Sequence, residues 1–168
     1  MRTWCAALVA LTILSSGSQI RAAGPNPACA LVKAAEIEAI VGSKVTSLIN
    51  GPADLGNGVE VCTGTAGSVA INIRFLPNPS DASAKSTSRI VDAARQMGSQ
   101  VESTTAGPIT CYLITPPEEM ADVVPTGTMC AMSKGSKIAV IELSTKATSA
   151  RVPLSKMHAL AQKLLWRL

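Results

Sequence analysis

Apolar and polar positions alternate most regularly between residues 69 and 76. Val69, Ile71, Ile73 and Phe75 are separated by Ala70, Asn72 and Arg74. A period of two residues predicts a strand with one buried face. The run over 59–65 precedes it across Ala66-Gly67-Ser68, so the two segments predict a hairpin.

Shorter apolar runs predict further strands, at 45–49, 101–106, 110–115, 127–133 and 138–144. Three other segments carry apolar residues at helical spacing. The first runs from Cys29 to Gly42, and the second follows a cap at Ser80 or Asp81. The last extends from Pro153 to about Leu165. In the second helix, one side is expected to be apolar: Ile90, Val91, Ala94 and Met97, up to Gly98.

Helices that alternate with blocks of strands favour an α+β domain. Because the connections are of hairpin length, we expect a single, mostly antiparallel twisted sheet with helices packed on it. A shift of 68 residues aligns Cys62 with Cys130 and Ile73 with Ile141. This match is compatible with two pseudo-repeated β-β-α halves, 29–98 and 107–168, and it is equally compatible with coincidence.

The N-terminus has the features of a secretory signal peptide. A basic residue is followed by an apolar run over 4–14 and by small residues up to Ala23. Such a run is too short to span a bilayer. We therefore expect residues 1–23 to be removed, with cleavage near Ala22–Gly24, leaving a single domain over 24–168. The expected location is the periplasm or the extracellular medium, with no membrane-spanning segment after cleavage.

Four cysteines remain after that cleavage, and an exported chain with an even number of cysteines is expected to form disulfides. Four cysteines allow three pairings, among which sequence alone does not decide. We favour Cys29–Cys62 and Cys111–Cys130, because each closes a short loop within one half. The absence of a Cys-x-x-Cys motif argues against a redox role.

Charge and composition argue against several functions. The chain has 15 basic and 11 acidic residues. Loss of Arg2 and Arg21 with the leader leaves 13 basic residues, and these are scattered. Aromatic residues make up 2% of the chain, so there are few faces on which bases or sugars stack. We expect no nucleic-acid binding.

A methionine-rich strand raises the alternative of a soft metal. Met129 and Met132 flank Cys130, and His158 is the only histidine. Sulfur and imidazole ligands suit copper in an exported protein. Met129 and Met132 nevertheless point to opposite faces of a strand, and methionine is a common core residue. The preferred interpretation is therefore no metal and no cofactor, with His158 as a surface or half-buried residue of a helix.

The segment from Pro116 to Pro125 is the clearest candidate for contact with a partner. It carries Glu118, Glu119 and Asp122 on a proline-bounded loop. Such a loop suits the basic cleft of a partner protein better than acid–base catalysis. An ordinary solvated loop is the alternative.

The start of the expected mature chain resembles a family. Cys29-x-Leu31, then Glu36-Ile37 and Val41-Gly42, is similar to the opening of small exported bacterial proteins and lipoproteins of unknown function. Their helix reads Cys-x-Leu-Leu-Thr-x-x-Glu-Val and ends in Leu-Gly-x-x-Val. This chain departs from that pattern at Val32-Lys33 and lacks a lipid-acceptor cysteine. The resemblance implies an α+β envelope domain, in which Cys62 fits the second cysteine, and it carries over no catalytic residue.

These features lead to one preferred function. No nucleophile elbow, phosphate loop or metal motif is found in the sequence after the leader. We expect a non-enzymatic exported module that binds a protein or an envelope component, for example as an inhibitor or an immunity protein. The alternative is a periplasmic protein that binds a small ligand or copper.

Overall fold

The computed structural model describes residues 27–51, 59–77, 85–146 and 150–168. The expected leader and the expected helix caps Ser80 and Asp81 lie outside these ranges. Four α-helices, seven strands and one 3-10 helix are formed within them. They are α1 (Pro27–Ala30), α2 (Ala34–Val41), β1 (Val45–Asn50), β2 (Glu60–Ala66), β3 (Val69–Leu76), α4 (Ser86–Gln96), β4 (Gln100–Ala106), β5 (Ile109–Thr115), η1 (Glu118–Met120), β6 (Thr126–Lys134), β7 (Lys137–Thr145) and α5 (Leu154–Leu165).

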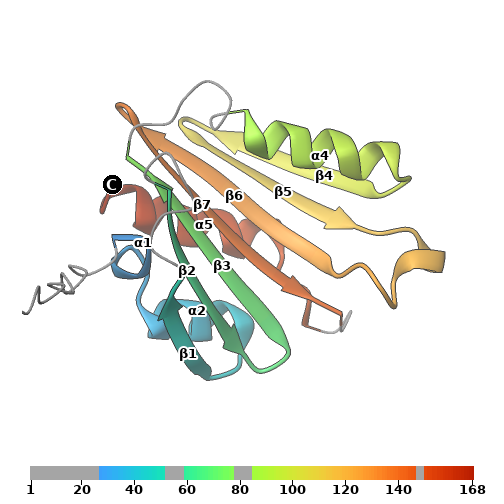
Figure 1. Cartoon of the computed structure of the whole chain (residues 1–168), viewed down its shortest axis with the longest axis horizontal. Helices are drawn as coiled ribbons and strands as arrows, with labels where there is room; N and C mark the ends of the chain where they lie inside the picture. Colours follow the sequence, from blue (N-terminus) through green and yellow to red (C-terminus); the bar gives the residue numbers. More distant parts are fainter. Residues whose placement is uncertain (1–26, 52–58, 78–84, 147–149) are drawn as a thin grey trace, which may run out of the picture.

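The strands form one open antiparallel sheet in the order β1-β2-β3-β7-β6-β5-β4 (Figure 1). This confirms the α+β class. The hairpin turns at Gly67 and Gly135 place these glycines at φ +59° and +60°, which side-chain-bearing residues rarely adopt. At the centre of the sheet Ile73 of β3 lies directly opposite Ile141 of β7.

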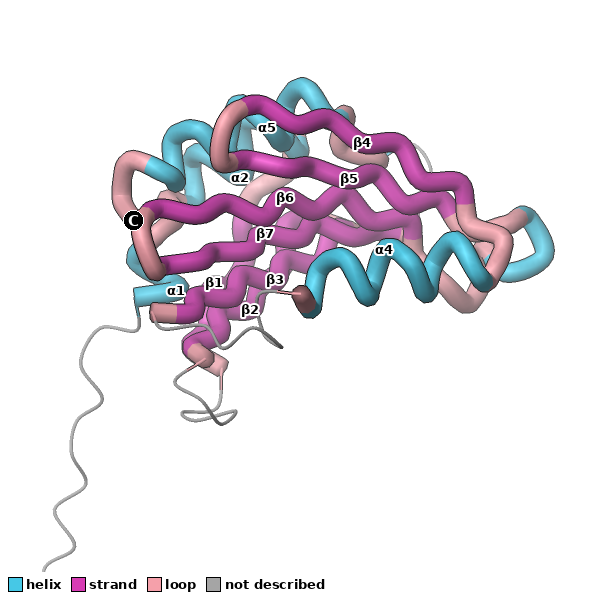
Figure 2. The backbone as a smooth tube through the Cα atoms, turned by 90° about the horizontal axis from the view of Figure 1, so that it is seen from above, coloured by secondary structure: helices cyan, strands magenta, loops and turns pink. Residues whose placement is uncertain are grey.

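The two faces of the sheet are covered differently. One, the inner face, carries Cys62, Ile73, Cys130 and Ile141 and packs against α1, α2 and α5. Among the described helices, only α4 packs on the opposite, outer face, which it covers in part (Figure 2). Thus the helix after β3 and the helix after β7 lie on opposite sides of the sheet.

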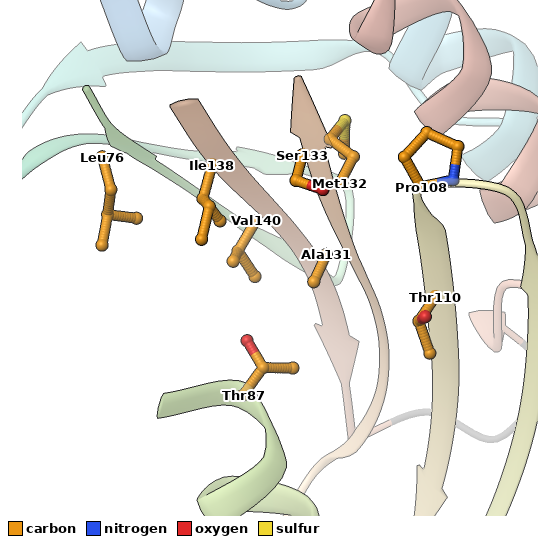
Figure 3. A pocket seen from close by; sticks show the side chains of 9 residues that line it. All are labelled: Leu76, Thr87, Pro108, Thr110, Ala131, Met132, Ser133, Ile138 and Val140. Carbon is orange, nitrogen blue, oxygen red and sulfur yellow. The ribbon is translucent and has the colours of Figure 1, made fainter. Parts of the chain in front are cut away.

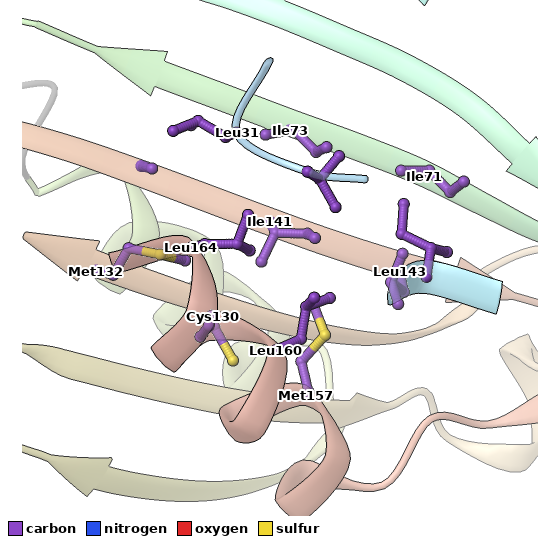
Figure 4. Packing of buried hydrophobic residues seen from close by; sticks show 14 of the residues in the cluster. Leu31, Ile71, Ile73, Cys130, Met132, Ile141, Leu143, Met157, Leu160 and Leu164 are labelled. Carbon is purple, nitrogen blue, oxygen red and sulfur yellow. The ribbon is translucent and has the colours of Figure 1, made fainter. Parts of the chain in front are cut away.

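The core is aliphatic and lies between the inner face and α5. On the helix side, Met157, Leu160 and Leu164 are at most 2% exposed. Figure 4 shows them facing the sheet residues that pack against them. Those residues are Ile71, Ile73, Cys130, Met132, Ile141 and Leu143. Apolar residues at helical spacing, as predicted for the last helix, thus form the buried side of α5.

Both expected disulfides are present. Cys29 of α1 is bonded to Cys62 of β2, and Cys111 of β5 is bonded to Cys130 of β6. The second pair also faces each other across the β5–β6 register. Their presence fits a protein that folds outside the cytoplasm. No helix in the described ranges has both the length and the apolarity that a membrane crossing requires.

The first helix was expected to be continuous from Cys29 to Gly42, and this prediction is wrong. The helix breaks at residues 31–33, and α2 restarts after Lys33. At the restart, the Glu36 carboxylate accepts the backbone N–H of Lys33 at 3.1 Å. The break allows Leu31 and Val32, neighbours in sequence, both to be buried.

The apolar side assigned to the second helix is only partly correct. Val91 and Ala94 of α4 are buried, as expected. Ile90 and Met97 are exposed, at 39% and 53%. Thr87 takes the remaining buried position instead, because the helix lies over the outer face with its first turn against the sheet.

Candidate functional site

The strand β4 forms one of the two edges of the sheet. It pairs with β5 on one side and is last in the strand order. Its residues are exposed, apart from half-buried Val101. An edge strand presents a row of N–H and C=O groups without partners from a neighbouring strand. Between its ends β4 has no proline and no lysine, residues that commonly protect such an edge, and its one charged residue is Glu102.

The opposite edge, β1, is less regular. Its pairing with β2 shifts register between Val45 and Ser47. Helix α2 packs against it, and the Glu38 carboxylate accepts the backbone N–H of Val45 at 3.0 Å. Because a regular ladder is needed to add a strand, β4 is the better template.

A groove runs beside β4 on the inner face. Helix α5 packs on β5 and β6, so β4 extends past it as a ledge. Two adjoining hollows of about 320 and 420 Å³ lie between the ledge and the helix, and Leu154 lines both. The floor consists of the inner-facing residues Glu102, Thr104 and Ala106, one from every second position of β4.

The wall of this groove is fixed by two contacts just before α5. The buried Thr128 hydroxyl of β6 donates to the carbonyl of Val152 at 2.6 Å. Arg151 pairs with Glu102 of β4 at 2.8 Å across the groove rim. The start of α5 is therefore held to the sheet from both sides of β5.

His158 lies in the hollow that is nearer to Ala106, the last residue of β4. It lines that hollow with Thr104, Ala106, Leu154 and Ser155. Its Nε2 is shielded from solvent and has no hydrogen-bond partner. A buried polar atom without a partner costs about 1–3 kcal/mol. Since the last torsion of a histidine ring is soft and roughly two-fold, the ring can turn toward a group that enters the hollow.

The acidic loop lies at the other end of β4. It begins after Thr115 of β5, which is the residue opposite Gln100, the first residue of β4. Glu118 and Glu119 belong to η1 and are exposed, as is Asp122. Figure 1 shows this segment projecting beyond the sheet between β5 and β6. The groove and the acidic loop thus follow one another along the edge of the sheet.

The alternative soft-metal residues are not brought together. Met129 and Met132 are three positions apart on β6, so they lie on opposite faces of the sheet. His158 belongs to the inner side, with α5. Within the described ranges no group of three or more His, Cys, Asp or Glu residues is placed to hold a metal ion. The geometry therefore does not favour copper binding by this set.

Two further hollows lie away from β4. One, of about 190 Å³, lies under the first turn of α4, where Thr87 points toward Val140 and Ala131 (Figure 3). The other, of about 460 Å³, is lined by Phe75, Leu31 and Glu60 among others. Glu60 has a buried Oε2 without a partner. Neither hollow adjoins an open strand.

By its fold and its groove, this chain is an α+β protein in which a helix flanks an open edge strand. Comparisons with protein-family models, with curated proteins and with solved structures find no match to this chain. The function therefore has to be argued from the site itself.

Sequence reasoning identified the acidic loop but not the groove. Residues 102–106 and 154–158 are about fifty positions apart, and they are brought together by the place of β4 beside β5 and by the packing of α5 on β5 and β6. The available signal was the stretch from Ser103 to Ala106, which is uncharged and lacks proline. Such a stretch in a strand indicates either a covered position or an edge that pairs with a partner.

Proposed function

We propose that this chain is a non-enzymatic binding module, exported to the periplasm or secreted, that takes an extended segment of a partner protein as an extra strand along β4. The observation that carries the proposal is a regular open edge whose inner-facing side chains form the floor of a groove. An inhibitor or immunity protein is one form of such a module.

The chemistry of the edge favours a peptide over other ligands. The unpaired N–H and C=O groups of β4 match the repeat of another extended backbone. Alternate side chains of the added strand then point into the groove beside α5, since side chains alternate between faces. Backbone pairing supplies affinity, and the groove supplies selectivity.

A small apolar ligand under α4 is the competing function. That hollow is lined by Leu76, Ile138 and Val140 with hydroxyls from Thr87 and Thr110. Its volume of about 190 Å³ is below the roughly 300–1,000 Å³ of typical ligand sites. We therefore rank it second.

Selection from a phage-displayed library of random peptides tests the proposal. The purified wild-type protein is the bait, and hydrogen exchange of its backbone amides is followed with and without a selected peptide. We expect recovery of peptides that slow exchange in β4. Thr104→Lys, on the groove floor, should reduce binding at least tenfold. Ser103→Lys is the matched control, because it adds the same charge to the outer face of the same strand.

Three outcomes would overturn the proposal. One is a selection without enrichment over a bait-free control. Another is peptide binding that protects α4 while β4 stays unchanged, which would indicate the hollow under that helix. The third is a concentration-dependent dimer in which β4 amides are protected without peptide, which would make a second copy of the chain the occupant.

A further inference from the structure

We infer that the partner segment runs antiparallel to β4 and carries, in order, a serine or threonine beside His158, an apolar residue beside Leu113, and basic residues at the acidic loop. This inference rests on the proposed function and adds the chemistry of the segment. Each of the three parts comes from a different region of the edge.

The hydroxyl residue follows from the hollow around His158. The other residues that line this hollow are Thr104, Ala106, Leu154 and Ser155, none of which is charged. A charged ligand group buried there would find no opposite charge among them. A hydroxyl both donates and accepts, so it can pair with either tautomer of the ring. The ring, which has an unpartnered nitrogen in the free protein, gains a hydrogen bond on binding.

The apolar residue follows from the second hollow. Leu113, Pro153 and Leu154 line it, while Glu102 and Arg151 are already paired with each other at its rim. Both hollows lie on the same face of β4, so side chains that fill them must be an even number of positions apart. An apolar side chain there removes surface from water without breaking the ion pair.

The basic residues follow from charge complementarity beyond the groove. Glu118, Glu119 and Asp122 are exposed at the Gln100 end of β4, past the second hollow. Every neighbouring pair in this sheet is antiparallel. An antiparallel segment would enter beside His158 and leave beside the acidic loop. Lysine or arginine on its C-terminal side would meet the three carboxylates.

A double-mutant cycle tests the hydroxyl contact. The probe is a fluorescent peptide of about eight residues, taken from the selection and carrying a threonine, an apolar residue and two lysines. Changing its threonine to valine should weaken binding to the wild type about tenfold. The same change should have little effect on binding to His158→Phe. His158→Gln, which keeps a hydrogen-bonding group, should restore part of the preference.

A second pair of measurements tests the acidic loop. Changing the peptide lysines to glutamate should weaken binding about threefold or more at low salt, and less at high salt. Glu118→Gln combined with Glu119→Gln should remove most of that difference. Lys134→Gln, on an exposed residue of the β6–β7 end of the sheet, removes a charge far from the loop and should leave that difference unchanged.

The outcomes separate this inference from the proposed function. If none of the selected peptides slows amide exchange in β4, both the proposed function and this inference are overturned. Two outcomes would overturn the inference alone. One is that peptides protect β4 but show no preference for a hydroxyl residue. The other is that the threonine-to-valine change weakens binding equally in the wild type and in His158→Phe. Selected sequences without enrichment of basic residues toward their C-terminal ends would overturn the antiparallel direction.

Discussion

Arg167 and Glu36 form a two-pronged ion pair that joins the segment after α5 to α2. Arg167 Nη1 donates to Glu36 Oε2 at 2.6 Å, and Nη2 donates to Oε1 at 2.5 Å. Nη1 also donates to the carbonyl of Leu31, in the break between α1 and α2. The side chains are 28% and 15% exposed, so the pair is partly shielded from water. It fixes the N-terminal helices on the inner face.

This pair predicts a specific dependence of stability on pH. The hydrogen bond from Arg167 lowers the pKa of Glu36 from 4.5 to about 2, against the opposing effect of burial. A carboxyl with a depressed pKa stabilises the fold above its unfolded pKa and loses that contribution as the pH falls toward its folded pKa. Arg167→Met should therefore cost about 1–3 kcal/mol at pH 7. The difference from the wild type should shrink between pH 4.5 and about 2.

Arg151→Met is the control for this measurement. Arg151 pairs with Glu102 at 2.8 Å, but those side chains are 40% and 63% exposed. Exposed pairs contribute roughly 0–1 kcal/mol. Urea unfolding of both variants and of the wild type across that pH range gives the comparison. A constant gap between Arg167→Met and the wild type down to pH 2 would contradict the prediction.

The two disulfides should contribute similar free energy but protect different regions. They span 33 and 19 residues, and loop closure of these lengths is worth about 3–4 kcal/mol each. Replacing Cys29 and Cys62 by serine should raise amide exchange in α1 and α2, because the bridge ties α1 to β2. Replacing Cys111 and Cys130 should leave those helices protected. Equal exchange in α1 and α2 for the two double variants would refute this difference.

Removing side-chain volume at the centre of the sheet should be costly. Ile141 is fully buried, opposite Ile73 and among the α5 residues of the core. Ile141→Ala should lower the free energy of unfolding by about 2–5 kcal/mol. Ile49→Ala is the control, since Ile49 is 61% exposed on β1. Denaturant midpoints measured with unchanged slopes decide the comparison, and similar losses for both variants would count against this core.

Gly64 should not tolerate alanine. A Cβ built on Gly64 of β2 would lie 2.1 Å from the carbonyl oxygen of Ser47 on β1. The backbone of β1 would have to move, which we expect to cost about 1–3 kcal/mol. A Cβ on Gly127 of β6 would meet its nearest neighbour, Ser144 Cβ, at 3.9 Å. Gly127→Ala should therefore change stability by less than about 1 kcal/mol. Thermal melts of the two variants compare them directly, with equal melting temperatures as the contrary result.

Much of the secondary structure could be predicted because its signals are local. The alternation from Val69 to Leu76 and the glycine turns at Gly67 and Gly135 define two hairpins without knowledge of the rest of the chain. The break after Ala30 could not be predicted in this way. It depends on the Cys29–Cys62 bridge and on burial of Leu31 and Val32 against the sheet, which are contacts across the fold.

The candidate site was predicted only at its acidic end. Glu118, Glu119 and Asp122 are charged residues on a proline-bounded loop, so their exposure follows from local sequence. His158 is expected to be a surface or half-buried residue of a helix, and it is half-buried. Its position beside Thr104 and Ala106 follows from α5 packing on β5 and β6 rather than on β4.

The amino-acid sequence by itself determined the strands, the hairpin turns and the aliphatic composition of the core, because these depend on residues a few positions apart. The tertiary structure alone decided which helix covers which face and which strand is left at the edge. Those outcomes depend on the pairing of β3 with β7, which joins the strands β1-β2-β3 to the strands β7-β6-β5-β4. This pairing places β4 last in the sheet, with α5 beside it. The groove exists because segments distant in sequence bury their apolar surfaces on the same sheet.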